Sequence, residues 1–229
     1  MHVFYTEDIL DGAALFAPED AKHAVRVLRL KPGEEIAVVA GGQRYAAAFL
    51  PGDRPGARLL APLPSTEASV RITLYQGLTK GERMDYTVQK CTEVGVAAIV
   101  PCLMCRCVAR EEKGKLSRWQ RIAREAARQA QRTRIPEVEP LIDFDALCER
   151  IAGHGQALVP WEEGGQPLRA AYQGAEDVAV IIGPEGGITP EEIKALGAVP
   201  ITLGPRILRA ETAGLVAAAG ILLLSGDMA

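Results

Sequence analysis

The sequence predicts an α/β fold in which helices cover a parallel sheet, preceded by a smaller β-rich unit. From residue 70 onward, segments typical of strands alternate with segments typical of helices. The strand segments are continuously apolar, as in sheets that are buried on both faces. Two of them end in Gly-Pro loops. The chain has 229 residues, 48% hydrophobic and 24% charged, so it can bury a sizeable core.

Residues 1–67 are expected to form the smaller unit. Turn residues and apolar alternation divide it, in chain order, into a helix from Pro18, a turn at 31–34, and the two strands of a hairpin at 36–40 and 43–50. Residues 61–66 contain two prolines and small polar residues, and they are predicted to link this unit to residues 68–229.

The second unit, residues 68–229, is predicted to alternate strands and helices. The expected strands are 70–76, 96–102, 157–159, 178–182 and 200–203, and the expected helices are 82–94, 116–133, 190–196 and 209–224. Gly95 is placed as the C-terminal cap of the first helix. The second helix is expected to end before Ile135-Pro136, because a residue preceding proline is biased away from helical geometry.

Composition excludes several classes of protein. The net charge of −3 argues against a generic polyanion binder, and the N-terminus lacks the pattern of a signal peptide, so a cytoplasmic location is expected. The longest apolar run, residues 215–224, is too short to span a bilayer. The five cysteines are odd in number, which disfavours a disulfide framework.

A cluster of three cysteines raises the possibility of a metal site. Cys102, Cys105 and Cys107 have no second Cys-x-x-Cys pair to accompany them, and none of the three histidines has ligand spacing. We therefore expect no metal, and we expect these thiols to be buried or half-buried in a strand.

The first Gly-Pro loop, residues 183–187, joins an apolar strand to a well-capped helix. Thr189 can serve as N-cap, Pro190 as the first helical residue and Glu192 as the third, which together make a capping box. The loop glycines permit positive φ and close approach of backbone to a ligand. The segment matches neither the Gly-x-Gly-x-x-Gly nor the P-loop pattern. A ligand site at the strand end is the hypothesis, and a plain tight turn is the alternative.

The second loop, residues 203–213, carries two arginines where a helix begins. Glu211 suits the helix N-terminus, whereas Arg206 and Arg209 oppose the helix dipole and suggest an anionic partner. The following helix has no polar face from residue 213 to 224, so it is predicted to be buried between the sheet and another surface, such as a second subunit.

A basic segment precedes these loops. Residues 106–134 contain ten Lys or Arg and three Glu, a local net charge of +7. On a helical wheel one stripe collects five arginines: Arg118, Arg121, Arg124, Arg128 and Arg132. Such a stripe favours contact with a phosphate backbone. A merely solvated face and a membrane-surface helix remain alternatives.

Taken together, the two loops resemble the paired signature of the bacterial 16S ribosomal RNA uridine-N3 methyltransferases, of the knotted SPOUT class. Further similarity lies in residues 23–33, 80–84, 89–96 and 118–136. Two departures affect the substrate pocket. The family has an acidic residue where Cys105 precedes Arg106, and it has Gln-Ser-Gly-Arg at residues 129–132, where this chain has Gln-Ala-Gln-Arg.

The resemblance implies a PUA-like β-barrel at residues 1–67 and a SPOUT domain with a parallel sheet and a deep trefoil knot at residues 68–229. It also implies a homodimer that methylates N3 of a uridine in 16S ribosomal RNA of the small subunit. S-adenosylmethionine is expected in three loops, at Leu158, Val159, Pro160, Ile182, Gly183, Pro184, Glu185, Gly186, Gly187, Leu203, Gly204, Ile207, Leu208, Arg209, Thr212 and Ala213.

The chemistry suggests roles for the charged residues. Arg209 is the candidate for stabilising the uracil anion, and Glu211 is a candidate proton acceptor. The residues expected to contact RNA are Arg26, Arg29, Lys80, Arg106, Arg118, Arg121, Arg124, Arg128 and Arg132.

Three other functions remain open at this point. The chain could be a SPOUT enzyme that acts on transfer RNA or on a ribose hydroxyl. It could be a non-catalytic RNA-binding module of ribosome assembly. It could also be a small-molecule enzyme, in which case the arginine stripe would be idle.

Overall fold

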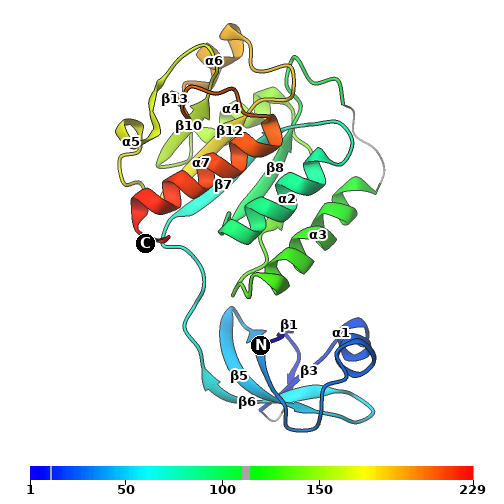
Figure 1. The fold of residues 1–229 in the computed structure, drawn as a ribbon. Coiled ribbons are helices and arrows are strands. Elements are labelled where there is room, and N and C mark those ends of the chain that lie inside the picture. Colours follow the sequence, from blue (N-terminus) through cyan, green and yellow to red (C-terminus); the bar gives the residue numbers. More distant parts are fainter. Residues whose placement is uncertain (11, 110–113, 229) are drawn as a thin grey trace. The chain divides into compact units, whose positions relative to one another are not determined.

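The computed structural model describes residues 1–10, 12–109 and 114–228. Its contacts divide the chain into two compact units, which are described separately (Figure 1). The first unit comprises residues 1–67 and 127–134, and the second comprises residues 68–126 and 135–229. None of the described helices combines the length and apolar character needed to cross a bilayer.

The first unit is built on a curled six-stranded sheet with the order β1-β4-β5-β6-β3-β2. The strands are β1 (Val3–Tyr5), β2 (Ile9–Leu10), β3 (Ala13–Leu15), β4 (Glu35–Ala40), β5 (Gln43–Leu50) and β6 (Gly56–Pro62). Strands β1 and β4 are parallel, and the other pairs are antiparallel. The predicted hairpin is confirmed as β4–β5, with Ala40 opposite Gln43.

Two features of this unit differ from expectation. The short strands β1, β2 and β3 and the longer strand β6 were not predicted. Residues 61 and 62 of the predicted linker belong to β6, because Ala61 and Pro62 pair with Ala46 and Tyr45. The helix α1 (Pro18–Lys22) begins at the predicted proline and continues directly into the π-helical turn η1 (His23–Val27).

The core of the first unit is aromatic. The rings of Phe4 and Phe16 stack with centroids 4.4 Å apart, and Phe49 lies 6.3 Å beyond Phe16. The guanidinium of Arg128 lies 5.9 Å from the centre of the Phe4 ring. A cation over an aromatic ring is attracted to its π face, so Arg128 contributes to this core.

The second unit contains a seven-stranded sheet with the order β11-β13-β10-β12-β7-β8-β9, and its paired strands are all parallel. The predicted parallel sheet is therefore confirmed. Its strands are β7 (Arg71–Gly77), β8 (Ala98–Cys102), β9 (Glu137–Val138), β10 (Gln156–Pro160), β11 (Gln166–Pro167), β12 (Asp177–Ile182) and β13 (Val199–Thr202).

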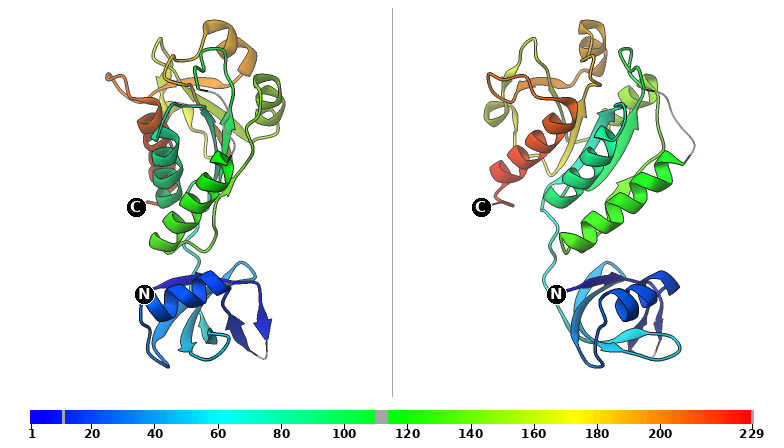
Figure 2. Two further views of the ribbon diagram at one scale, coloured as in Figure 1. Left: turned by 90° about the vertical axis from the view of Figure 1, so that its right-hand side faces the viewer. Right: turned by 45° about the vertical axis from the view of Figure 1, so that its right-hand side comes forward.

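Helices cover both faces of this sheet (Figure 2). Successive strand residues alternate between two cores: Leu74 faces the core beneath α2, α3 and α7, whereas Tyr75 faces the core beneath α4 and α6. The helices are α2 (Arg83–Val94), α3 (Lys115–Gln129), α4 (Phe144–Ile151), α5 (Leu168–Ala171), α6 (Pro190–Leu196) and α7 (Ala210–Ser225).

The helix ends show why local sequence was informative in some places and misleading in others. Gly95 caps α2 in the left-handed conformation, with φ of 116°, as predicted. Helix α3 was predicted to reach residue 133 but ends at Gln129. Gln131 adopts a positive φ of 55°, and the amide of Arg132 donates to the carbonyl of Ala127, which closes the helix early.

Candidate functional site

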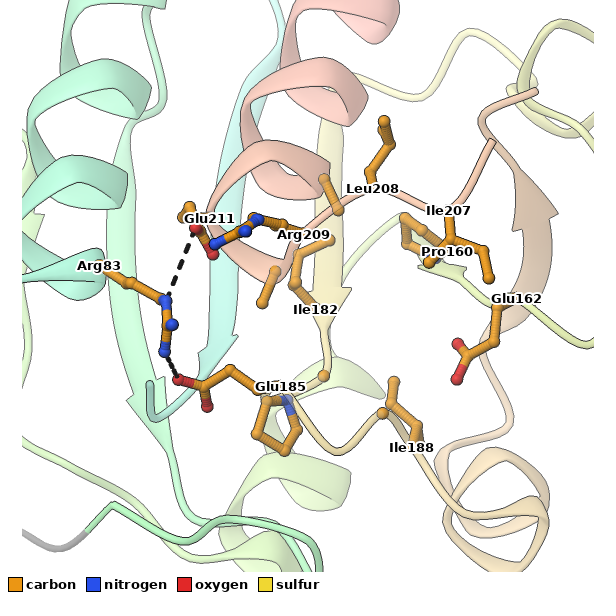
Figure 3. A pocket seen from close by; sticks show the side chains of 15 residues that line it. Arg83, Pro160, Glu162, Ile182, Glu185, Ile188, Ile207, Leu208, Arg209 and Glu211 are labelled. Atoms are coloured by element: carbon orange, nitrogen blue, oxygen red, sulfur yellow. Dashed lines mark hydrogen bonds and ion pairs between the residues drawn. The ribbon is translucent and has the colours of Figure 1, made fainter. Parts of the chain in front are cut away.

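A cavity of about 480 Å³ lies where β10 and β12 end and α7 begins; we call it the loop cavity (Figure 3). In parallel α/β sheets, ligands bind at such carboxyl ends of strands. The lining residues are Arg83, Pro160, Glu162, Ile182, Gly183, Pro184, Glu185, Gly187, Ile188, Ile207, Leu208, Arg209, Ala210, Glu211 and Ala213.

The glycines in and beside the loop after β12 have no room for a side chain. A Cβ atom on Gly183 would lie 2.6 Å from Cγ1 of Ile188, and one on Gly77 would lie 2.5 Å from the backbone nitrogen of Pro184. Gly187 has φ of +74°, and a Cβ there would lie 2.5 Å from Oε1 of Glu162. The glycines therefore allow three segments to meet around the cavity, as their number in the loop suggested.

The carboxylate of Glu185 ties this loop to α2. Its Oε1 accepts from the backbone amide of Lys80 at 2.9 Å and from Nη1 of Arg83 at 2.5 Å. Burial alone would raise the pKa of Glu185, but the Lys80 amide and the Arg83 guanidinium outweigh burial, and the pKa is lowered. Glu185 is therefore ionised at neutral pH.

A second carboxylate holds the other end of the loop. Glu192 is only 6% exposed. Its Oε2 accepts from the amide of Thr189 at 2.9 Å, and the Thr189 hydroxyl accepts from the Glu192 amide at 3.1 Å. The predicted capping box is thus confirmed. Oε1 of Glu192 also accepts from the amide of Cys105 at 2.7 Å, so the cap anchors the turn that follows β8.

Opposite charges meet at the start of α7. Arg209 is the N-cap residue of α7 and is exposed, and Glu211 lies in the first turn. Oε1 of Glu211 lies 3.7 Å from Nε of Arg83, which therefore stands between Glu185 and Glu211 (Figure 3). Oε2 of Glu211 is buried without a hydrogen-bond partner among the described residues. The Glu211 side chain lines the loop cavity, where a carboxylate is able to accept a hydrogen bond.

A smaller cavity of about 140 Å³ adjoins the loop cavity and is lined by Pro160, Trp161, Glu162 and residues 201–208, together with Ala213. The two cavities contain most of the predicted cofactor residues. They are Pro160, Ile182, Gly183, Pro184, Glu185, Gly187, Leu203, Gly204, Ile207, Leu208, Arg209 and Ala213.

Four predicted cofactor residues lie elsewhere. Leu158 and Val159 are fully buried in the two cores of the sheet. The Gly186 carbonyl accepts from Nη1 of Arg106 at 3.1 Å, and Thr212 lines a neighbouring cavity.

Sequence reasoning assigned no site role to the lining residues Arg83, Glu162, Ile188 and Ala210. Arg83 and Ala210 both stand in segments that carried the family resemblance, which was the available signal for these two residues.

The predicted arginine stripe is split by the structure. Arg121 and Arg124 are exposed on α3, and Arg118 is paired with Asp85 of α2. Arg132 was placed on this stripe wrongly: it lies beyond the end of α3, is 3% exposed, and is paired with Glu67. Arg128 is mostly buried and paired with Asp20.

The remaining predicted RNA contacts are on the surface. Arg26, Arg29, Lys80 and Arg106 are exposed. Residues 110–113, which belong to the predicted basic segment, lie outside the described residues.

The cysteine cluster differs from the expected strand. Cys102 is buried in β8, whereas Cys105 and Cys107 follow it outside the strand, and Cys105 is exposed and not buried as expected. Burial raises the pKa of the Cys102 thiol, and the Cys107 thiol donates to the Cys102 carbonyl at 3.7 Å. Within residues 1–10, 12–109 and 114–228, no group of three His, Cys, Asp or Glu side chains is arranged to hold a metal ion.

Comparisons with known proteins agree with this geometry. Residues 66–222 match the RNA methyltransferase domain family, and residues 16–50 match the RNA methyltransferase PUA domain family. A ribosomal RNA small subunit methyltransferase E of Mycobacterium tuberculosis is 34% identical, with 98% of this chain and 93% of the relative covered.

Solved structures of methyltransferases are also similar to this chain. A ribosomal RNA small subunit methyltransferase E of Neisseria gonorrhoeae, bound to S-adenosyl methionine, is 32% identical over the whole of both chains, with a TM-score of 0.88. A methyltransferase of Legionella pneumophila in complex with the same cofactor is 31% identical over 97% of both chains, with a TM-score of 0.84. The chain therefore belongs to the RNA methyltransferase family that includes the ribosomal RNA small subunit methyltransferases E.

Proposed function

We propose that this protein transfers the methyl group of S-adenosylmethionine to N3 of a uridine in 16S ribosomal RNA of the small subunit. The observation that carries the proposal is the loop cavity, whose walls are backbone loops at the ends of β10 and β12 and the start of α7. Related proteins of nearly the same fold carry this cofactor, and relatives over nearly the full chain are named for small-subunit ribosomal RNA.

The residues present fit the cofactor. The cavity of about 480 Å³ is within the range of small-molecule sites, and its glycines let backbone amides and carbonyls approach a ligand. The residues proposed to hold it come from residues 158–160, 182–187 and 203–213. When bound, S-adenosylmethionine supplies an activated methyl group. The protein supplies alignment and a charge pattern suited to the transfer.

Uracil N3 bears a proton and becomes a nucleophile only when that proton leaves. We assign proton acceptance to Glu211, because its side chain lines both the loop cavity and a neighbouring cavity and lies in the first turn of α7. Arg209, exposed at the start of α7, stabilises the negative charge that develops on the uracil oxygens. Transfer then forms the bond from N3 to carbon and breaks the bond from carbon to sulfur, whose electron pair stays on sulfur.

The product of the reaction tests the function directly. The nucleosides of 16S ribosomal RNA from a strain lacking this protein are compared by mass spectrometry with those from the complemented strain. We expect 3-methyluridine to disappear on deletion and to return with the gene. A lost ribose methylation, a lost transfer RNA modification, or an unchanged nucleoside profile would contradict the proposal.

Arg209→Ala is expected to lower turnover by about 100-fold or more, the effect of removing a donor that stabilises a developing anion. Affinity for S-adenosylmethionine, measured by calorimetry, should remain. Arg169→Ala is the control, because Arg169 is exposed on α5 and lines neither the loop cavity nor the smaller cavity beside it. If Arg209→Ala turns over as fast as wild type, Arg209 does not stabilise the uracil anion.

We further propose that the curled sheet of residues 1–67 is a PUA-like barrel and that residues 68–229 contain a deep trefoil knot. The match of residues 16–50 to a PUA domain family supports the first. The knot is supported by the likeness to the RNA methyltransferase family and by the way residues 183–185, 187 and 207–209 line one cavity with the start of α7. We also propose that the protein acts in the cytoplasm, where ribosomal subunits are assembled.

The protein is proposed to act as a homodimer through one flank of α7. Val216, Leu223 and Leu224 are apolar and 36%, 62% and 39% exposed on a helix with no charged residue after Glu211. Covering this flank with a second copy would remove apolar area from water. Leu223→Glu should shift sedimentation toward the monomer, and a wild-type protein that sediments as a monomer would contradict the proposal.

A further inference from the structure

A larger cavity of about 690 Å³ lies beside the loop cavity; we call it the outer cavity. It is lined by Lys80, Gly81, Glu82, Arg83, Tyr86, Glu211 and Thr212. Arg83 and Glu211 line both cavities, so a ligand in the outer cavity would reach the same carboxylate as a ligand in the loop cavity.

The walls of the outer cavity suit a nucleotide. Tyr86 of α2 is 42% exposed, which leaves its ring available for stacking on a base. Lys80 is exposed just before α2 and offers a cation to a phosphate. Gly81 has φ of +63°, and the space that a Cβ would occupy there is open, so the turn before α2 leaves the entrance clear.

The polar groups match the edge of one base. Uracil presents a carbonyl oxygen, the N3 proton and a second carbonyl oxygen in a row. Glu211 and Thr212 both line the outer cavity: a carboxylate there can accept the central proton, and a hydroxyl there can donate to a flanking oxygen. Cytosine has an unprotonated N3, which would face the Glu211 carboxylate without a hydrogen. Such an arrangement of groups favours uracil over cytosine.

We propose that the outer cavity receives the target uridine, unstacked from the RNA, with Tyr86 stacking on its base, Lys80 at its phosphate, and N3 directed at Glu211. This inference rests on the proposed function. It adds the site that binds the target uridine, and it assigns recognition of the uracil edge to Glu211. Unstacking a base costs free energy, and a tyrosine face that replaces the lost neighbour offsets it.

The test is the KM for small ribosomal subunits in methylation assays with Tyr86→Ala and Tyr86→Phe. Tyr86→Ala should raise KM about 5- to 150-fold, the effect of losing one stacked base. Tyr86→Phe keeps the ring and should stay within about twofold of wild type. Both variants should bind S-adenosylmethionine as wild type does in calorimetry, because Tyr86 does not line the loop cavity.

Two controls separate the possible failures. Gln89→Ala, on an exposed residue one turn further along α2, should leave KM unchanged. Sedimentation of Tyr86→Ala should match wild type, and an altered oligomeric state would place Tyr86 in a subunit contact and overturn the inference. The inference would also be overturned if Tyr86→Ala had the KM of wild type, or if Tyr86→Phe raised KM as much as Tyr86→Ala does. If the wild-type protein methylates no ribosomal RNA, the proposed function fails as well.

Discussion

Gly187 shows how strictly a single residue can be constrained at the loop cavity. Its φ of +74° is a conformation that residues with side chains rarely adopt, and a Cβ there would lie only 2.5 Å from Oε1 of Glu162. Gly197, at the C-terminal end of α6, has φ of +61° with open space around the same position. Both glycines therefore need a positive φ, but only at Gly187 would an added Cβ also clash with another side chain.

Gly187→Ala and Gly197→Ala should each reduce the free energy of unfolding by about 1–2 kcal/mol, the cost of a left-handed non-glycine residue. Only Gly187→Ala should also weaken S-adenosylmethionine binding, by about 10-fold, because Glu162 must move from the cavity wall. Chemical denaturation and calorimetry measure the two effects. Equal cofactor affinity in both variants would show that the wall tolerates the shift.

At the residue scale, the sequence predicted what local patterns encode. Glycines, a capping box and an arginine beside a helix start were visible in short segments, and Thr189 and Arg209 lie where they were expected. The bridge from Arg83 to Glu185 and Glu211 joins residues more than 100 positions apart in the sequence, so no local pattern contains it. Arg132 was misplaced for the same reason, since its partner Glu67 is distant in sequence.

At the scale of elements, α6 and α4 offer a matched pair of helix caps. Thr189 caps α6 directly after the glycine-rich loop, and Asp143 caps α4 by accepting from the amide of Ala146. Both caps satisfy an amide that the helix leaves unpaired. Only the first cap, through Glu192, also holds the Cys105 amide beside the loop.

Thr189→Ala and Asp143→Ala should each lower the free energy of unfolding by about 0.5–2 kcal/mol. At about 2–4 °C per kcal/mol for a chain of this size, thermal unfolding detects either change. Thr189→Ala alone should weaken binding of S-adenosylmethionine, because the loop that ends at this cap lines the cavity. Asp143→Ala with a comparable binding loss would indicate a general effect of instability.

Element prediction succeeded where periodicity ran long. The apolar strands β7 and β12 and the helix α2 have clear patterns and clear caps, and the structure contains them. Strands of two or three residues, such as β2 and β9, are too short to carry a period. Helix α4 was missed, although the Asp143 cap and the apolar spacing of Leu147 and Ile151 could have indicated it.

At the scale of the whole molecule, charge is divided between structure and surface. Arg128 forms an ion pair with Asp20, and Arg132 forms one with Glu67. Arg121 and Arg124 are instead exposed on α3. The overall net charge of −3 means that such local groups, and not the molecule as a whole, must attract an RNA backbone.

Replacing both Arg121 and Arg124 by Ala should reduce the salt dependence of RNA binding. Each arginine withdrawn from a phosphate lowers the magnitude of the slope by about 0.7–0.9, so a decrease of about 1.4–1.8 is expected. Arg169 on α5 and Lys194 on α6 are exposed, and their double replacement changes net charge equally. A slope that falls equally in both double variants would assign the effect to net charge alone.

The position of β12 affects how this chain can fold during synthesis. It pairs with β10 on one side and with β7 on the other, yet it follows both in sequence. Until residue 182 has left the ribosome, β7 and β10 each keep an unpaired edge, and such edges invite association with other chains. Pairing β7 with β12 also closes a loop of about one hundred residues, which slows folding. Translation speed and chaperone access should therefore limit the yield of this protein more than its final stability does.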